Sequence, residues 1–135
     1  KKMSKSETAP NHAINLLDKP DAIRAKLARA TTDSLKEIRF DEARPGIYNL
    51  LTIYQTLTGK NKKDIEAQFE GKGYGDFKKA VAEVVIESLR PLQERFKALT
   101  AEPGHIDAIL KAGADKARPI AEKTLAEVQK KIGLG

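Results

Sequence analysis

The sequence contains no cysteine, few aromatic residues and no long apolar run. The absence of cysteine excludes disulfides and thiolate metal sites, so the chain can work in a reducing or an oxidising compartment. No apolar run approaches the ~18 residues of a membrane-spanning helix, and the opening residues lack the hydrophobic centre of a secretion signal. We therefore expect a cytoplasmic protein with no membrane partner.

Strand signals are also almost absent, because no segment alternates apolar and polar residues with the β-branched enrichment of a strand. Apolar residues recur instead at helical spacing along most of the chain. The sequence predicts an all-α fold, a helical bundle of about five or six helices preceded by a mobile loop.

The first helices are bounded by recognisable capping residues. Asp18 is the expected N-cap of a helix that has Pro20 in its first turn. A second helix, over residues 47–57, is expected to end at Gly59, because glycine favours the left-handed conformation that follows a helix. Asn61 is the expected N-cap of a third, short helix.

The longest apolar stripe begins at Phe77 and predicts the spine of the bundle. Pro103 is expected to start another helix that Ala112 and Gly113 interrupt, and a last helix is expected to close on Gly133. The stripe consists of Phe77, Val81, Val84, Val85, Leu89, Leu92, Phe96 and Leu99, and the side chains expected to be buried in the helix after Pro103 are Ile106, Ile109 and Leu110.

Basic residues outnumber acidic ones, 25 to 19, which gives a net charge of +6. This balance favours a polyanionic partner such as RNA. Most of the basic residues alternate with acids, so for any single one a role in solubility is the better interpretation. The two histidines, His12 and His105, have no ligand-like spacing, and we expect no metal site.

The opening residues Lys2-Met3-Ser4-Lys5-Ser6 form the strongest local signal. Two ammonium groups three residues apart, joined by small serines, can approach phosphates while hydroxyls and backbone amides donate hydrogen bonds. The alternative interpretation is a solvated basic tail.

Further blocks follow in a fixed order, and with the opening residues they resemble the C-terminal part of bacterial tryptophanyl-tRNA synthetases over essentially the whole chain. The KMSKS motif alone specifies class I aminoacyl-tRNA synthetases, and the proline-glycine and glycine-lysine-glycine blocks indicate the tryptophan enzyme. The corresponding part of a tyrosyl-tRNA synthetase is the nearest alternative. The blocks are Thr32-Asp33-Ser34, Arg44-Pro45-Gly46-Ile47-Tyr48-Asn49-Leu50-Leu51, Leu57-Thr58-Gly59, Glu70-Gly71-Lys72-Gly73-Tyr74-Gly75-Asp76-Phe77-Lys78, Leu89-Arg90-Pro91-Leu92-Gln93-Glu94-Arg95 and Gly113-Ala114-Asp115-Lys116-Ala117.

The resemblance implies an ATP-dependent tryptophan–tRNA ligase, which forms tryptophanyl adenylate and transfers tryptophan to tRNA(Trp). It implies ATP binding by Lys2, Met3, Ser4, Lys5 and Ser6, with Lys5 and Lys2 as the catalytic residues. Lys5 would stabilise the phosphates, Lys2 would hold pyrophosphate, and Met3 would lie near the adenine. ATP would arrive with Mg²⁺ as substrate in the full enzyme, and this fragment would bind no cofactor tightly.

The resemblance also divides the chain. Residues 1–17 would form the KMSKS loop and the connection to a nucleotide-binding Rossmann half that is absent from this sequence, and residues 18–135 would form the helical anticodon-binding domain. The sole methionine, Met3, follows two lysines, so we expect a piece of a longer protein. Tryptophan would bind through the missing half, the full-length enzyme would be a homodimer, and the fragment alone is predicted to be inactive. No short motif identifies the anticodon contacts.

Two other functions are compatible with the residues alone. A stand-alone basic helical module could bind RNA non-specifically, with KMSKS a coincidence. A structural helical bundle could carry its charges for solubility only, and it would show no salt-dependent affinity for tRNA.

Overall fold

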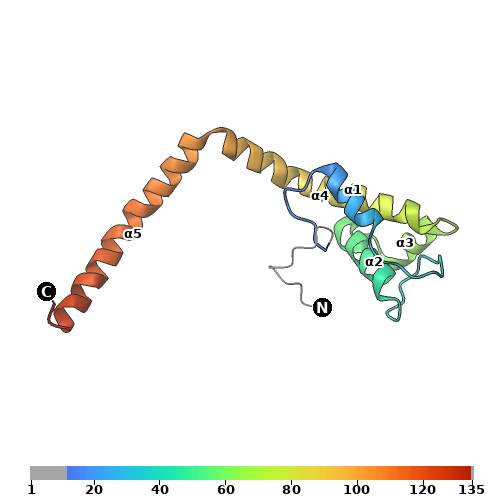
Figure 1. The fold of residues 1–135 in the computed structure, drawn as a ribbon, viewed down its shortest axis with the longest axis horizontal. Helices are drawn as coiled ribbons and strands as arrows, with labels where there is room; N and C mark the ends of the chain where they lie inside the picture. The colour runs from blue at the N-terminus through green and yellow to red at the C-terminus, as the bar shows by residue number, and fades with distance from the viewer. Residues whose placement is uncertain (1–11, 135) are drawn as a thin grey trace. The chain divides into compact units, whose positions relative to one another are not determined.

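The computed structural model describes residues 12–134, which form five helices and no β-strand (Figure 1). This confirms the predicted all-α fold and the number of helices. The expected mobile opening loop lies outside the described residues. One compact unit, the N-terminal unit, extends to Gln93, and the C-terminal unit runs from Glu94 onward. The helices are α1 (Pro20–Ala28), α2 (Pro45–Thr58), α3 (Lys62–Phe69), α4 (Tyr74–Ala101) and α5 (Pro103–Lys131).

Helix α1 begins without the predicted cap. Lys19 precedes Pro20 at the N-cap position, and no side chain caps the helix. The prediction for Asp18 was therefore wrong. Its carboxylate instead accepts hydrogen bonds from the Asn15 backbone amide at 2.9 Å and from Lys26 Nζ at 2.5 Å. A lysine two turns along offers a charge-assisted partner, which is stronger than a neutral amide.

The caps of α2 and α3 are as predicted. Gly59 follows α2 with φ 68°, the left-handed conformation that residues other than glycine adopt at a cost. Asn61 Oδ1 accepts a hydrogen bond from the Asp64 backbone amide at 2.9 Å, which satisfies one of the free amides at the start of α3.

The core of the N-terminal unit is contributed by all of its helices and by Ile38 of the loop before α2. Its centre is aromatic. The Phe69 ring meets Phe77 edge-on at 4.9 Å and Tyr54 at 5.3 Å between ring centroids, an arrangement that aligns ring edges with ring faces. The remaining core side chains are Ile23, Leu27, Ile47, Leu50, Leu51, Ile65, Val81, Ala82, Val85 and Ile86.

The predicted apolar stripe of α4 is buried only in its first half. Phe77, Val81 and Val85 lie in the core, whereas Leu92 and Phe96 are 44% and 46% exposed. Helical spacing identified this apolar face but not the length of the partner that covers it.

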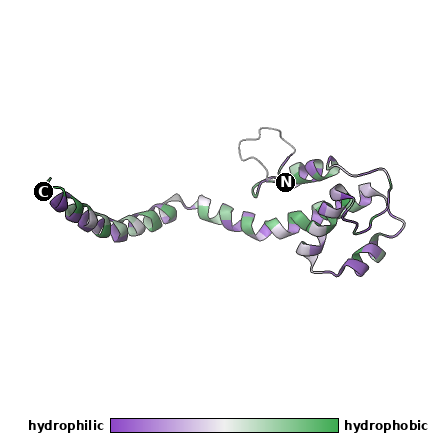
Figure 2. Cartoon of the chain, turned by 90° about the horizontal axis from the view of Figure 1, so that it is seen from below, coloured by the Kyte–Doolittle hydropathy of each residue, from purple (hydrophilic) through white to green (hydrophobic). Residues whose placement is uncertain are grey.

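Helix α5 corrects two predictions in the C-terminal unit. It runs without interruption through Gly113, where a break was expected, and one helix replaces two. A glycine in a helix interior costs only ~1 kcal/mol, which neighbouring good helix formers offset. Ile109 and Leu110, expected to be buried, are 57% and 64% exposed. Apolar and polar residues are interspersed along α5 (Figure 2), and none of the described side chains from residue 94 onward is buried.

Within the described residues, no helix is long and apolar enough to span a membrane. Helix α2 contains no charged residue, but its 14 residues are fewer than a membrane-spanning helix needs.

The start of α2 packs directly against the loop that precedes it. A Cβ on Gly46 would collide with the carbonyl oxygen of Thr31 and would lie 3.4 Å from Thr32 Cα. Only glycine therefore fits this approach of two backbone segments.

We predict that Gly46→Ala destabilises the protein by about 2 kcal/mol or more, because the colliding atoms are backbone and cannot rotate away. Urea unfolding monitored by circular dichroism measures the change. Gly104→Ala, where an added Cβ meets nothing within 4 Å, is the matched control and should not be destabilised. Equal stability of Gly46→Ala and wild type would contradict the packing described here.

Candidate functional site

The predicted ATP-binding residues Lys2, Met3, Ser4, Lys5 and Ser6 lie outside the described residues, so their roles stay predictions. The motif blocks within the described chain can be placed. Three of them, around Asp33, Arg44 and Tyr74, meet at one point of the N-terminal unit.

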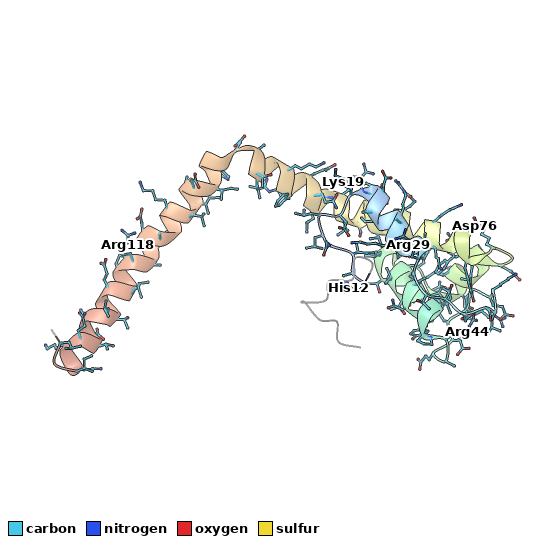
Figure 3. All side chains as sticks on the ribbon, viewed as in Figure 1. His12, Lys19, Arg29, Arg44, Asp76 and Arg118 are labelled. Carbon is cyan, nitrogen blue, oxygen red and sulfur yellow. The ribbon has the colours of Figure 1, made fainter. Side chains whose placement is uncertain are left out.

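Arg44 is the centre of this meeting point, which we call the Arg44 cluster, composed of Asp33, Glu37, Arg44 and Tyr74. Its guanidinium forms a bidentate pair with the Asp33 carboxylate. Nε donates to Oδ2 at 2.9 Å, and Nη2 donates to Oδ1 at 3.0 Å. Nη2 also donates to the Glu37 carbonyl oxygen at 2.8 Å and to the Tyr74 hydroxyl at 2.5 Å. The Tyr74 hydroxyl in turn donates to Asp33 Oδ1 at 2.6 Å. Figure 3 labels Arg44 among the side chains near the start of α2.

The cluster is partly withdrawn from solvent. The Arg44 side chain is 9% exposed and that of Asp33 28%. Hydrogen bonds from Arg44, and then from Tyr74, hold the pKa of Asp33 well below its ordinary value. The hydrogen bond to Asp33 raises the pKa of Arg44, and burial raises that of Tyr74. Asp33 and Arg44 are therefore charged at neutral pH, and the tyrosine is protonated.

The cluster fixes the loop between α1 and α2 against the start of α4. The Glu37 carbonyl is held by Arg44, and Ile38 is buried in the core. The Phe40 backbone amide donates to Glu66 Oε1 of α3 at 2.8 Å. Because the loop is attached to Arg44 before α2, to α3 and to the start of α4, it has a defined conformation.

Next to the cluster is a cavity of about 700 Å³, lined by residues 36–39 of the loop, by α3 and by the turn at residues 69–73. We call it the basic pocket. Its cations are Lys36, Arg39, Lys63 and Lys72, and none of the ion pairs among the described residues includes any of them. Lys72 Nζ lies 5.3 Å from the centroid of the Phe69 ring.

Lys36 lines the basic pocket and has a φ of 61°. Among the described residues other than glycine, it alone has a positive φ. A lysine in the left-handed region costs on the order of 1 kcal/mol, and such strain persists only where the surrounding structure imposes it. Attachment of the next two residues, through the Glu37 carbonyl and the Ile38 side chain, imposes it here.

A second set of contacts anchors the segment that leads back to the opening motif. Gln93 Nε2 of α4 donates to the carbonyl oxygens of Leu16 at 2.9 Å and Asp18 at 3.1 Å. The hydrogen bond from Lys26 lowers the pKa of Asp18, so this pair is ionised at neutral pH. The segment before α1 is thus attached to both α1 and α4.

Among residues 12–134, the acidic side chains form no metal site. No group of three His, Cys, Asp or Glu side chains within residues 12–134 is placed to hold a metal ion. Glu66, which belongs to an i,i+4 acidic pair, is occupied by the Phe40 amide, and Glu83 binds Arg24 through two hydrogen bonds at 2.7 and 3.1 Å.

Sequence reasoning found the motif blocks but not what connects them. Tyr74 and Gln93 each belong to a motif block, but neither had an assigned role. The signal available for Tyr74 was its place at the start of a helix, next to two glycines, where a large side chain can reach across to another segment. No local pattern indicates that Asp33 and Arg44 pair.

Comparison with known proteins gives one family. The model of the tRNA synthetases class I (W and Y) matches residues 1–90. A tryptophan–tRNA ligase of Wolinella succinogenes is 57% identical over 134 residues, covering 99% of this chain and 41% of the relative. One from Helicobacter pylori is 50% identical over 133 residues, covering 98% of this chain and 40% of the relative.

A solved structure agrees. The tryptophanyl-tRNA synthetase from Mycoplasma pneumoniae is similar with a TM-score of 0.67 and 34% sequence identity, covering 100% of this chain and 43% of that one. The chain spans about two fifths of the length of the curated relatives it matches.

Proposed function

The chain belongs to the class I tRNA synthetases of the tryptophan and tyrosine type, and on this basis we propose that it is the C-terminal part of a tryptophan–tRNA ligase. The observation that carries the proposal is the 57% identity to a tryptophan–tRNA ligase across 99% of the chain. The similarity in fold to a tryptophanyl-tRNA synthetase supports it.

The proposed reaction has two steps. A carboxylate oxygen of tryptophan attacks the α-phosphorus of ATP, the bond to the β-phosphate oxygen breaks, and pyrophosphate leaves. A ribose hydroxyl at the end of tRNA(Trp) then attacks the carbonyl carbon of the adenylate, a proton is lost from that hydroxyl, and AMP leaves. Both steps move negative charge onto phosphate oxygens, which fixed cations stabilise.

In this proposal the opening residues bind ATP. Lys5 stabilises the phosphates as charge moves to pyrophosphate, and Lys2 holds the leaving group. Met3 lies near the adenine, and Ser4 and Ser6 donate hydrogen bonds. In this proposal Mg²⁺ comes with ATP as part of the substrate of the full enzyme.

We further propose that residues 1–17 are the catalytic loop and its connection, and that residues 18–135 bind the anticodon. The anchoring of Leu16 and Asp18 by Gln93 supports a boundary there, because it attaches the connection to the helical body. Tryptophan would be bound by the part of the ligase that precedes this chain, and the whole enzyme would be a cytoplasmic homodimer.

Pyrophosphate exchange tests this proposal. We predict no tryptophan-dependent exchange by the 135-residue chain alone, because positioning of tryptophan against ATP supplies much of the rate and depends on the preceding part. The full-length protein should exchange with tryptophan and not with tyrosine. Exchange with tyrosine alone would assign the chain to the other branch of the family, and robust exchange by the purified fragment would contradict the proposed division of labour.

Lys5→Ala in the full-length protein tests the catalytic loop. The Lys5 ammonium should interact most strongly with the phosphates in the transition state, so its loss should cost roughly 3 to 4 kcal/mol, or about a hundred- to a thousandfold in the rate of adenylate formation. Single-turnover adenylate formation measures this rate.

Affinities for tryptophan and tRNA should change by much less than about tenfold in Lys5→Ala, because other residues hold both ligands. Lys79→Ala is the control, since the Lys79 side chain is 83% exposed and pairs only loosely with Asp76 at 4.0 Å. An unchanged single-turnover rate in Lys5→Ala would show that the catalytic assignment is wrong.

A further inference from the structure

The basic pocket combines a cavity, unpaired cations and walls that the rest of the unit holds in place. A cavity of about 700 Å³ falls within the range of small-ligand sites. Four cationic side chains line it, and the ion pairs among the described residues leave all four without a carboxylate partner. The pocket therefore has positive charge available for an anion.

The walls of the pocket are fixed independently of any ligand. The Arg44 cluster holds the Glu37 carbonyl at 2.8 Å, Glu66 holds the Phe40 amide at 2.8 Å, and Phe69 is buried within the aromatic centre of the core. A binding site gains affinity when its backbone is already ordered, because less conformational entropy is lost on binding.

The cations differ from these walls in being long and exposed. Lys36 and Arg39 belong to the fixed loop, and Lys72 belongs to the turn at residues 69–73. Cations from two segments that line one cavity can contact one phosphate or two successive phosphates of a backbone.

The same pocket also carries hydrogen-bond acceptors. Glu37, Glu66 and Glu70 line it. Glu66 Oε1 accepts a hydrogen bond from the Phe40 backbone amide, whereas Glu37 and Glu70 form no ion pair within the described chain. A carboxylate accepts hydrogen bonds from the amino groups of cytosine or adenine, so an anionic ligand that also carries a base fits better than a bare phosphate.

We propose that the basic pocket binds an unpaired nucleotide of the tRNA, with Lys36, Arg39 and Lys72 on its phosphates and the carboxylates of Glu37 and Glu70 facing its base. This inference rests on the proposed function, which supplies a tRNA substrate. Unpaired nucleotides are the part of an RNA whose base edges a protein pocket can reach. The left-handed Lys36 fits this role, because the strained backbone places a cation at the rim of the cavity.

The test compares two RNAs on the full-length protein. One is the anticodon stem-loop of tRNA(Trp), and the other is a fully paired hairpin stem of equal length and charge, closed by a short non-nucleotide linker. The variant is Lys36→Asn with Arg39→Gln, which removes two charges and keeps a residue that tolerates positive φ at position 36. The control is Lys130→Gln with Lys131→Gln, which removes two charges from the last turn of α5.

Fluorescence anisotropy should show the Lys36/Arg39 variant binding the stem-loop about tenfold or more weakly than wild type. The slope of log affinity against log salt should become smaller by about 1 to 1.5, because two phosphate contacts are lost. Binding of the paired hairpin should be unchanged, and the control variant should resemble wild type with both RNAs.

Equal stem-loop affinity of the Lys36/Arg39 variant and wild type would overturn the inference, as would an equal loss on the paired hairpin. Pyrophosphate exchange separates this failure from failure of the proposed function. If wild type exchanges with tryptophan while the variant binds the stem-loop normally, only the pocket assignment is wrong. If wild type shows no exchange with tryptophan, the proposed function itself is wrong. Should the double variant not fold, Lys72→Gln provides the same comparison with one charge removed.

Discussion

The guanidinium of Arg44 joins the loop between α1 and α2 to the start of α4. It binds Asp33 of the first loop with both ends, the Glu37 carbonyl of the same loop, and the Tyr74 hydroxyl at the start of α4. Only arginine offers this planar set of donors, and a lysine at the same position would provide a single point charge. Gly46 belongs to the same junction, because its lack of a side chain lets α2 begin directly against Thr31.

The consequences of this junction reach both proposed functional regions. Fixing Glu37 gives one wall of the basic pocket its position. Helix α4 begins at Tyr74, within the Arg44 cluster, and about five turns later carries Gln93, which anchors the segment that leads to the opening motif. One continuous helix within the N-terminal unit thus carries both attachments, one for the loop that lines the basic pocket and one for the connection to the proposed ATP-binding residues.

What the sequence could predict followed from local rules. The end of α2 at Gly59 and the start of α3 at Asn61 depend on the conformation and hydrogen bonds of a few neighbouring residues, and both are as predicted. The all-α fold followed from helical spacing. The same rules were wrong for Asp18, because Lys26 competes for its carboxylate, and for Gly113, because one glycine does not break a helix of good formers.

The Arg44 cluster could not be predicted, because its members are 11 and 30 residues from Arg44 in the sequence. The basic pocket depends on the same tertiary contacts, and alternation of charge along the sequence gave no sign of which cations gather around one cavity. The roles of Lys2 and Lys5 came from resemblance, and they stay predictions, since these residues lie outside the described part of the chain.

The stability of Asp33→Asn against pH tests most directly whether the Arg44 cluster holds the unit together. Because the folded pKa of Asp33 is lowered, its contribution is complete above its unfolded pKa of about 4 and is lost progressively as the pH falls from that value through the lower folded pKa. Urea unfolding from pH 6 to pH 3 should therefore show a steeper loss of stability in wild type than in Asp33→Asn, with the difference between the two curves shrinking toward pH 3. Glu83→Gln, at the exposed pair with Arg24, should reduce that slope less. Parallel curves for wild type and Asp33→Asn would show that the cluster is not the constraint described here.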